Sequence, residues 1–288
     1  LFAFGAGAVG TVAGTLMAFR VVPLGEEGWK LAGIFCATYI GGGMNYAATA
    51  EALELRSGDL LAAGIAADNL VMTLYFLLLF SLPSFGWLRR RYVRRHLEEG
   101  SEAGAVAPSP RDRVKAWLSW NALISVALGA VLCVAGYKSA EALGIDSLGI
   151  LMVTALTVAL ATVSPSRIGK LESGPRIGTA LMQVFFAAIG ANAHIGIALR
   201  VGPKLFVFAG LILAVHLAAI LALGRVMRLD LAEIVVASNA NMGGPTTAAA
   251  MAAARRWNAL ITPAILCGTL GYASATFIGV AIGKWLAP

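Results

Sequence analysis

The sequence predicts an all-α polytopic membrane protein. Hydrophobic residues make up 59% of the 288 residues and charged residues only 13%, whereas soluble domains carry about 25% charged residues. So few charges cannot cover the water-exposed surface of a chain of this length. The apolar residues also fall into long runs, and a helix needs about 20 such residues to cross a bilayer. We therefore expect spanning helices along the whole chain, with no separate soluble domain.

The predicted spans follow one another closely. Two of them are interrupted by glycine and polar residues, and the one at 147–163 is short. In chain order the segments are 1–20, 29–56 (interrupted), 58–82, 117–137, 147–163, 177–199, 202–224, 231–256 (interrupted) and 258–286.

The longest polar segment, 86–116, carries a cluster of basic residues, and its middle is rich in Gly, Ala, Ser and Pro. Basic loops of membrane proteins stay on the cytoplasmic side, so this segment is predicted to be a basic cytoplasmic linker. Loops 164–176 and 225–230 then also lie inside and agree with the rule, whereas Arg255 and Arg256, placed outside, do not. The net charge of +7 does not indicate nucleic-acid binding, because the basic residues lie in short loops between apolar runs.

The second interrupted segment holds a polar centre within apolar flanks. Pro245 has no N–H and disfavours helix at Gly244, so a helix that begins at Leu231 should end near Asn241 and begin again near Thr246. A broken helix in a membrane is tolerated only where its freed backbone groups are buried in protein or line a wet cavity. Asn and Thr side chains beside such a break are typical of a substrate or ion site.

A similar break is predicted at Gly41–Gly43, about 200 residues earlier, and the flanking spans match as well. Close packing through small residues would explain one such run. Two runs in corresponding places favour a pair of crossing broken helices in a duplicated fold. The predicted domains are 1–85, the C-terminal part of a first repeat whose earlier helices would precede Leu1; 86–116, the linker; and 117–288, the second repeat. Counting spans makes the two halves parallel, whereas crossing broken helices usually belong to inverted repeats, so their relation stays open.

These two motifs resemble those of the YjcL-like membrane proteins, grouped with the cation/proton antiporter and anion transporter superfamily. The matching residues are Gly41-Gly42-Gly43-Met44-Asn45-Tyr46-Ala47-Ala48 with Glu51, and Ala237 to Met251 around Gly243-Gly244-Pro245. The resemblance implies a transporter fold with a panel domain and a core domain that holds the crossed helices. It also implies an N-terminally shortened chain, located in a bacterial inner membrane or, in a eukaryote, a plastid envelope.

Asp68 is the most informative single residue, because it lies in the middle of span 58–82. An uncompensated carboxylate at that depth costs at least ~2.5–3.5 kcal/mol, so it usually faces a cavity and has a role. The alternative is a structural hydrogen bond to the broken backbone of 29–56. The resemblance relates Asp68 and Asn69 to the acidic pair that binds ions in cation/proton antiporters. The predicted ion ligands are Asp68, Asn69, Asn45, Asn239 and Asn241, with Na⁺ or H⁺ as the coupling ion, since no soft ligands are present.

The solute is expected to contact the broken helices, whose N-termini suit anions. The candidate substrate-binding residues are Gly43, Thr49, Glu51, Gly243, Gly244, Thr246, Thr247, Asn192 and His194. Glu51 has two interpretations, an ion ligand or a surface residue near Glu54 and Arg56. His216, alone among Leu and Ala, is interpreted as a packing histidine whose hydrogen bonds are satisfied.

The function predicted from these features is ion-coupled secondary transport of a small solute, an organic anion carried with Na⁺ or H⁺. The alternative is a cation/proton antiporter that uses Asp68. A non-transport membrane protein or an intramembrane enzyme fits less well, because the only imaginable nucleophile–base pair is Ser238 with His194. No cofactor or metal is expected, and the three scattered cysteines are interpreted as small buried hydrophobes. The expected partners are the solute, the lipid bilayer and a second copy of the chain in a homodimer, but no nucleic acid.

Overall fold

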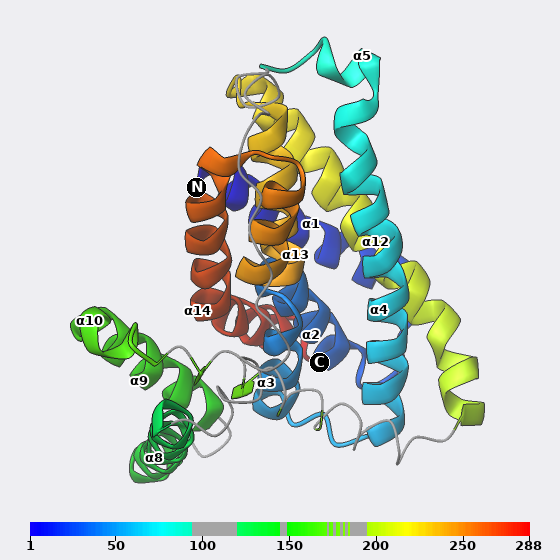
Figure 1. Cartoon of the computed structure of the whole chain (residues 1–288). Coiled ribbons are helices and arrows are strands. Elements are labelled where there is room, and N and C mark those ends of the chain that lie inside the picture. Colours follow the sequence, from blue (N-terminus) through cyan, green and yellow to red (C-terminus); the bar gives the residue numbers. More distant parts are fainter. Residues whose placement is uncertain are drawn as a thin grey trace. The chain divides into compact units, whose positions relative to one another are not determined.

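A computed structural model describes residues 1–93, 120–144, 149–171 and 195–288, with a few isolated positions between 172 and 194. The described residues are helical and contain no β-strand (Figure 1). The chain forms two compact units, Leu1–Ala103 with His194–Pro288, and Gly104–Ala193. In the second unit, α8 (Trp120–Ala142) packs against α9 (Gly149–Val163), and α10 (Pro165–Ile168) follows. The first unit holds both interrupted segments.

Helices long and apolar enough to cross a membrane occur at five of the predicted spans. They are α1 (Phe2–Val21), α4 (Gly58–Ser81, continued by the 3-10 turn η1, Leu82–Ser84), α8, α12 (Ile195–Val226) and α14 (Ile261–Leu286, preceded by the turn η3, Asn258–Leu260). Helix α9 is apolar but shorter, in agreement with the short predicted segment. The predicted span 177–199 lies largely outside the described residues.

Both predicted helix breaks are confirmed, and each lies at a glycine. Helix α2 (Gly28–Gly41) and helix α3 (Gly43–Ala52) are separated by Gly42, whose φ and ψ are 84° and 175°. Helix α13 (Leu231–Ala254) is broken at Gly244, with a φ of 75° and a ψ of −166°. This backbone region is essentially restricted to glycine. Pro245, directly after Gly244, prevents the helix from simply continuing.

Each broken helix is a hairpin rather than a crossing span, so this part of the prediction was wrong. In α13, Asn239 Nδ2 lies 3.4 Å from Met251 Sδ, although these residues would be ~18 Å apart along a straight helix. In the other hairpin, Lys30 Nζ near the start of α2 donates to the Glu54 carbonyl just after α3, at 3.0 Å. The extended glycine reverses the chain, and each segment returns to the end from which it entered.

The two hairpins enter from opposite ends of the unit. The α2–α3 hairpin opens where α4 begins, at the capping residue Ser57. The α13 hairpin opens where α4 ends, because the Arg255 guanidinium lies 4.8 Å from the Phe80 ring. Helix α4 has 24 residues and therefore spans ~36 Å at 1.5 Å per residue, so the two hairpin openings are far apart. Figure 1 shows α3 and the end of α13 at opposite ends of α4.

The hairpin tips meet in the interior. A Cβ atom added to Gly42 would lie 3.2 Å from the Gly244 nitrogen and 3.3 Å from the Gly243 carbonyl carbon. The approach therefore depends on the absence of a side chain at Gly42.

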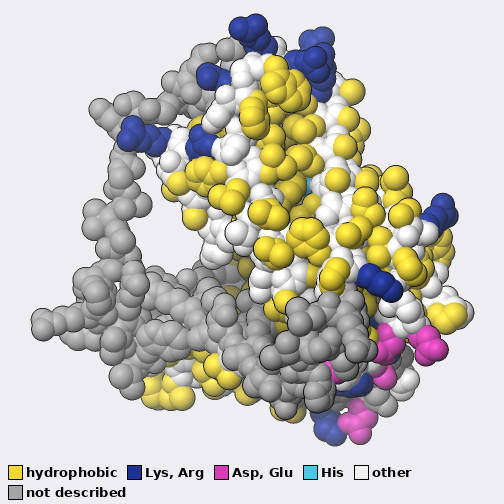
Figure 2. All heavy atoms as spheres, turned by 90° about the vertical axis from the view of Figure 1, so that its right-hand side faces the viewer, with side chains coloured by type: hydrophobic (Ala, Val, Ile, Leu, Met, Phe, Trp, Pro, Cys, Tyr) yellow, Lys and Arg dark blue, Asp and Glu magenta, His cyan; other side chains and the backbone are white. Residues whose placement is uncertain are grey.

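Basic residues gather at the end where α13 opens. Helix α5 (Gly86–Arg89) follows α4 there, and Tyr92 Oη donates to the Leu221 carbonyl near the end of α12 at 2.8 Å. This end carries Arg89, Arg90, Arg91, Arg225, Arg228, Arg255 and Arg256. In Figure 2 a cluster of basic side chains lies at one end, and the acidic side chains visible on that face lie at the other. Because α13 turns back, Arg255 and Arg256 lie on the same side as Arg225 and Arg228, which removes the exception noted in the sequence.

Helix α14 supports both hairpins through glycines on one face. A Cβ atom on Gly268 would meet Pro245 and Gly244 of the α13 tip. Farther along α14, Gly271 lies against the Ile40 carbonyl and Gly279 against the Gly33 carbonyl, both on α2. Small residues at such positions let membrane helices approach closely.

Replacing Gly279 with alanine is expected to destabilise the protein by about 1–3 kcal/mol, the usual cost of overpacking. The new Cβ would lie 2.5 Å from the Gly33 carbonyl oxygen, so α14 and α2 must separate. Thermal unfolding in detergent measures the effect. Gly210→Ala on α12 is the matched control, since nothing lies within 4 Å of that position. Equal melting temperatures for the two variants would contradict the close packing described here.

Candidate functional site at the hairpin tips

Two helix N-termini meet at the tips, one at the start of α3 and one after the break in α13. The first amides of a helix have no partner within it and carry the positive end of the helix dipole. One side of the tips is open, since Met44 is 42% exposed, Thr246 is exposed, and no atom lies within 4 Å of a Cβ on Gly43. The predicted substrate residues at or beside the tips are Gly43, Gly243, Gly244, Thr246 and Thr247.

Asn45 and Asn239 stabilise the hairpins. Asn45 Nδ2 donates to the Gly41 carbonyl at 2.9 Å, and its Oδ1 accepts from the Thr276 hydroxyl of α14 at 2.7 Å. Asn239 Oδ1 accepts from the Thr247 hydroxyl at 2.7 Å, which joins the two arms of α13. Both amide oxygens therefore already accept a hydrogen bond from the protein, and no hydrogen bond joins either asparagine to Asp68 among the described residues.

Four buried oxygen atoms near the hairpins lack a hydrogen-bond partner within the part of the chain that the structure describes. They are Tyr39 Oη, Thr49 Oγ1, Asp68 Oδ1 and Asn241 Oδ1. Tyr39 and Asn241 each lie one helical turn before their break glycine. The amide nitrogen of Asn241 donates to the Phe4 carbonyl of α1 at 3.1 Å, so its orientation is fixed. Buried polar atoms are rarely left unpaired, so these oxygens mark places for water, an ion or a solute.

Asp68 lies on the inward face of α4, among residues that contact both hairpins. Gly64, one turn earlier, adjoins the Tyr46 hydroxyl of α3, and Phe76, two turns later, adjoins Gly243 of α13. The Asp68 carboxyl is a side-chain hydrogen-bond neighbour of the Tyr39 hydroxyl, and it interacts electrostatically with the hydroxyls of both Tyr39 and Tyr46. The alternative hydrogen bond from Asp68 to the broken backbone is absent from the described residues. The carboxylate is thus placed beside the hairpins and next to Tyr39 of α2, and its Oδ1 lacks a hydrogen-bond partner among the described residues.

Two predicted site residues lie away from the tips. Asn69 is exposed on α4, because successive helical side chains point ~100° apart. Glu51 pairs with Arg56 at 3.1 Å, and its side chain is 47% exposed, which favours the surface interpretation. Asn192 and His194 lie outside the described residues.

A polar network that the sequence did not predict lies beside the α13 hairpin. Ser238 Oγ is 2.8 Å from Tyr75 Oη and 3.0 Å from His216 Nε2. His216 Nδ1 is 2.8 Å from the Gly7 carbonyl oxygen. The satisfied histidine is confirmed, and it is a partner of Ser238, whereas His194 lies outside the described residues. The glycines on the face of α1 that meets α12, Gly7, Gly10 and Gly14, were the signal that a buried residue of another helix would lie there.

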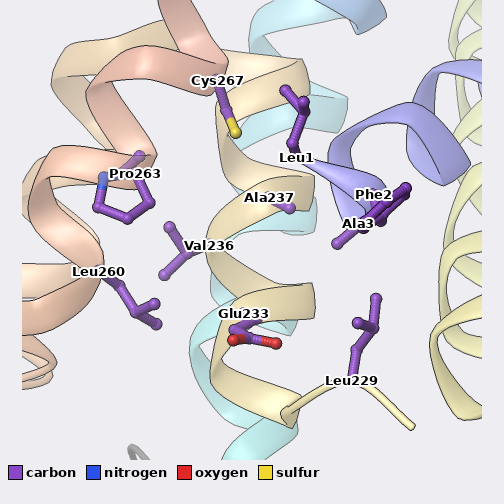
Figure 3. A pocket seen from close by; sticks show the side chains of 11 residues that line it. Leu1, Phe2, Ala3, Leu229, Glu233, Val236, Ala237, Leu260, Pro263 and Cys267 are labelled. Atoms are coloured by element: carbon purple, nitrogen blue, oxygen red, sulfur yellow. The ribbon is translucent and has the colours of Figure 1, made fainter. Parts of the chain in front are cut away.

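A cavity of about 300 Å³ lies away from the tips, between the starts of α1, α13 and α14 (Figure 3). Its lining is mainly apolar, and its one carboxylate, Glu233, accepts from the Asp230 N–H in the cap of α13. This cavity therefore offers less chemistry for a polar solute than the hairpin tips do.

Comparison with known proteins identifies the family. The whole chain, residues 1–288, matches the family described as "Protein of unknown function (DUF819)". The chain belongs to this family. It is also 36% identical over 301 aligned positions to a Bacillus subtilis (strain 168) protein named "Uncharacterized membrane protein YjcL", covering 99% of the chain and 75% of that relative. No solved structure matches it.

Membership of the DUF819 family agrees with the apolar helices of the structure. The relative is named as a membrane protein, and five described helices are long and apolar enough to span a bilayer. The chain is therefore a multi-pass integral membrane protein of the YjcL-like group.

Proposed function

We propose that this DUF819 family member is a secondary transporter of a small organic anion, coupled to Na⁺ or H⁺. The main observation behind this proposal is that two hairpins enter from opposite ends of the unit and that their tips, at Gly42 and Gly244, are in contact. Discontinuous helices that meet in this way form the substrate and ion sites of many secondary transporters. A protein with only a structural or receptor role would not need two polar helix breaks in contact.

An inverted duplication is part of the proposal. Helices α1, α2–α3 and α4 correspond in order to α12, α13 and α14. Glu54 follows Gly42 by the same number of residues as Arg256 follows Gly244, and both have positive φ, 53° and 59°. The bonds from Leu55 N to Ala50 O and from Trp257 N to Ala252 O also correspond. Opposite entry of the hairpins favours inverted rather than parallel halves, with the helices around the tips as the core domain.

The anion is assigned to the tips and the coupling ion to Asp68. Two sets of first-turn amides and the Thr246 hydroxyl offer hydrogen-bond donors to a carboxylate. Asp68 offers a negative charge that no described Lys, Arg or His pairs with, and the nearby oxygens suit Na⁺. Cation/proton antiport through Asp68 is the second candidate, favoured by the same unpartnered carboxyl oxygen. By the positive-inside rule, the arginine-rich end is assigned to the cytoplasm.

Purified protein in liposomes is expected to accumulate its solute only while an ion gradient is present. A thermal-shift panel of small organic acids, each with Na⁺, K⁺ or a change of pH, selects the solute and ion. Uptake of the selected acid is then measured with and without ionophores that collapse each gradient. Stabilisation by cations and pH but by no acid would favour antiport. Recovery of a chemically altered ligand, detected by mass spectrometry, would contradict transport and indicate an enzyme.

A further inference from the structure

A chain of hydrogen bonds joins four helices beside the α13 hairpin. It runs from Tyr75 on α4 through Ser238 on α13 to His216 on α12, and on to the Gly7 carbonyl of α1. The Thr11 hydroxyl of α1 also lies 3.0 Å from His216 Nδ1. His216 and Ser238 are fully buried. These hydrogen bonds thus link α13 to three of the helices that pack against it, α1, α4 and α12.

The Gly7 carbonyl at one end of this series fixes which group donates in each hydrogen bond. A carbonyl oxygen only accepts, so His216 Nδ1 carries the hydrogen that points to Gly7. In the neutral ring, Nε2 is then an acceptor and the Ser238 hydroxyl donates to it. Ser238 Oγ in turn accepts from the Tyr75 hydroxyl. The neutral chain therefore has every donor and acceptor satisfied, with hydrogens ordered from Tyr75 toward His216.

We propose that His216 is a second ion-binding site of the transporter, specific for a proton, and that Ser238 transmits its occupancy to α13. A proton from the aqueous phase adds to Nε2, which becomes a donor. Ser238 then accepts from His216 and donates to Tyr75, so both hydroxyls rotate and no covalent bond other than N–H forms. This inference rests on the proposed transport function, but its first test does not need a known solute.

Proton binding is coupled to movement because protonation reverses the direction of the hydrogen bonds. They then run from His216 toward Tyr75, and the Tyr75 hydroxyl is left without an acceptor. The Tyr75 hydroxyl hydrogen must then point elsewhere, and Tyr75 lines an apolar groove between α4 and α12. The other side chains of that groove come from Val71, Leu74, Leu78, Phe206, Leu213 and Leu221, among others, and none is an acceptor. A buried donor without an acceptor is unfavourable. Protonation of His216 therefore favours a conformation in which α4 and the α13 hairpin have shifted apart.

No countercharge contacts His216 within the part of the chain that the structure describes. On α1 it meets Gly7 and Thr11, on α13 Ser238, and on α4 the edge of Tyr75, with ring centroids 6.2 Å apart. Tyr75 is the titratable group among these neighbours, and no described Asp, Glu, Lys or Arg pairs with the ring. An unpaired buried charge is costly, which strengthens the link between protonation and conformational change.

His216→Gln is the informative variant, because the Gln side chain keeps one donor for Gly7 and one acceptor for Ser238 but cannot hold a proton. Nitrogen NMR of histidine-labelled protein in lipid, titrated across acid and alkaline pH, is expected to show one ring signal that changes from singly to doubly protonated and is missing in His216→Gln. A His216 signal that stays singly protonated over the whole titration would overturn the proposal.

Uptake separates this inference from the proposed function. Parent protein is expected to take up solute in response to a pH gradient, and the rate for His216→Gln is expected to be at least about tenfold lower. Thr73→Val, which removes an exposed hydroxyl on α4, serves as the control and should match the parent. A His216→Gln rate equal to the parent rate would overturn the proton site and leave transport standing. Absence of gradient-driven uptake in the parent would instead contradict the proposed function, and the NMR titration alone would then decide whether His216 binds a proton.

Discussion

Asp68→Asn is expected to abolish ion-dependent stabilisation and to reduce gradient-driven uptake to the level of empty liposomes. A neutral amide cannot supply the negative charge that offsets the dehydration of a monovalent cation, nor can it exchange a proton. The protein should stay folded, because Asp68 Oδ1 has no hydrogen-bond partner among the described residues and an amide in its place can still accept from the Tyr39 hydroxyl. Removing an uncompensated carboxylate at membrane depth relieves a cost of at least ~2.5–3.5 kcal/mol, so the variant should be as stable as the parent without ions, or more so.

Two measurements test this result. The first is the melting temperature with and without Na⁺, which for a specific ion rises as ligand exceeds its dissociation constant. The second is uptake into liposomes under a Na⁺ or pH gradient. Asn69→Ala is the matched control, since this neighbour is exposed on α4 and should retain both responses. If Asp68→Asn keeps the Na⁺ response of the parent, Asp68 is structural and the assignment of the ion site is wrong.

The helices and their breaks could be predicted because local chemistry determines them. Apolar runs fix the spans, and Gly243-Gly244-Pro245 cannot continue a regular helix. The sequence could not show that the chain reverses direction at each break, because the reversal depends on the φ and ψ of one glycine. The two arms of α13 together contain enough residues for one full span, so counting residues treated a hairpin as a crossing. That single error separated Arg255 and Arg256 from Arg225 and Arg228 and added one crossing to the number of spans counted between the two motifs.

Residue types drew attention to the polar side chains of the candidate site, but they could not show how those side chains are arranged. Asp68 and the asparagines stand out in apolar segments, and the structure places them around the hairpins. The sequence could not show which asparagine side-chain oxygens lack a hydrogen bond, because the partners are far away in the chain. Asn45 bonds to Thr276, and Asn241 bonds to the Phe4 carbonyl. Asn69 was misplaced because the resemblance to a paired acidic motif outweighed the rotation between neighbouring helical residues.

Gly42→Ala is expected to destabilise the protein by at least about 1–3 kcal/mol, the cost of holding a residue other than glycine in its backbone region. The φ of 84° and ψ of 175° at Gly42 suit glycine alone. Its Cβ would also lie within 3.2–3.4 Å of three backbone atoms of the opposite tip. Relief requires the tips to separate, so solute uptake should fall together with the melting temperature.

The next residue supplies the control. Gly43 is the first residue of α3, and a Cβ there meets nothing within 4 Å. Alanine is the better helix former by roughly 1 kcal/mol, so Gly43→Ala should leave the melting temperature unchanged or raise it. Adjacent Gly→Ala changes are thus expected to have opposite effects on stability, measured by thermal unfolding of both variants in one detergent. Equal losses would mean that Gly42 is not the reversal point of the α2–α3 hairpin, and the contact between tips that supports the proposed site would no longer stand.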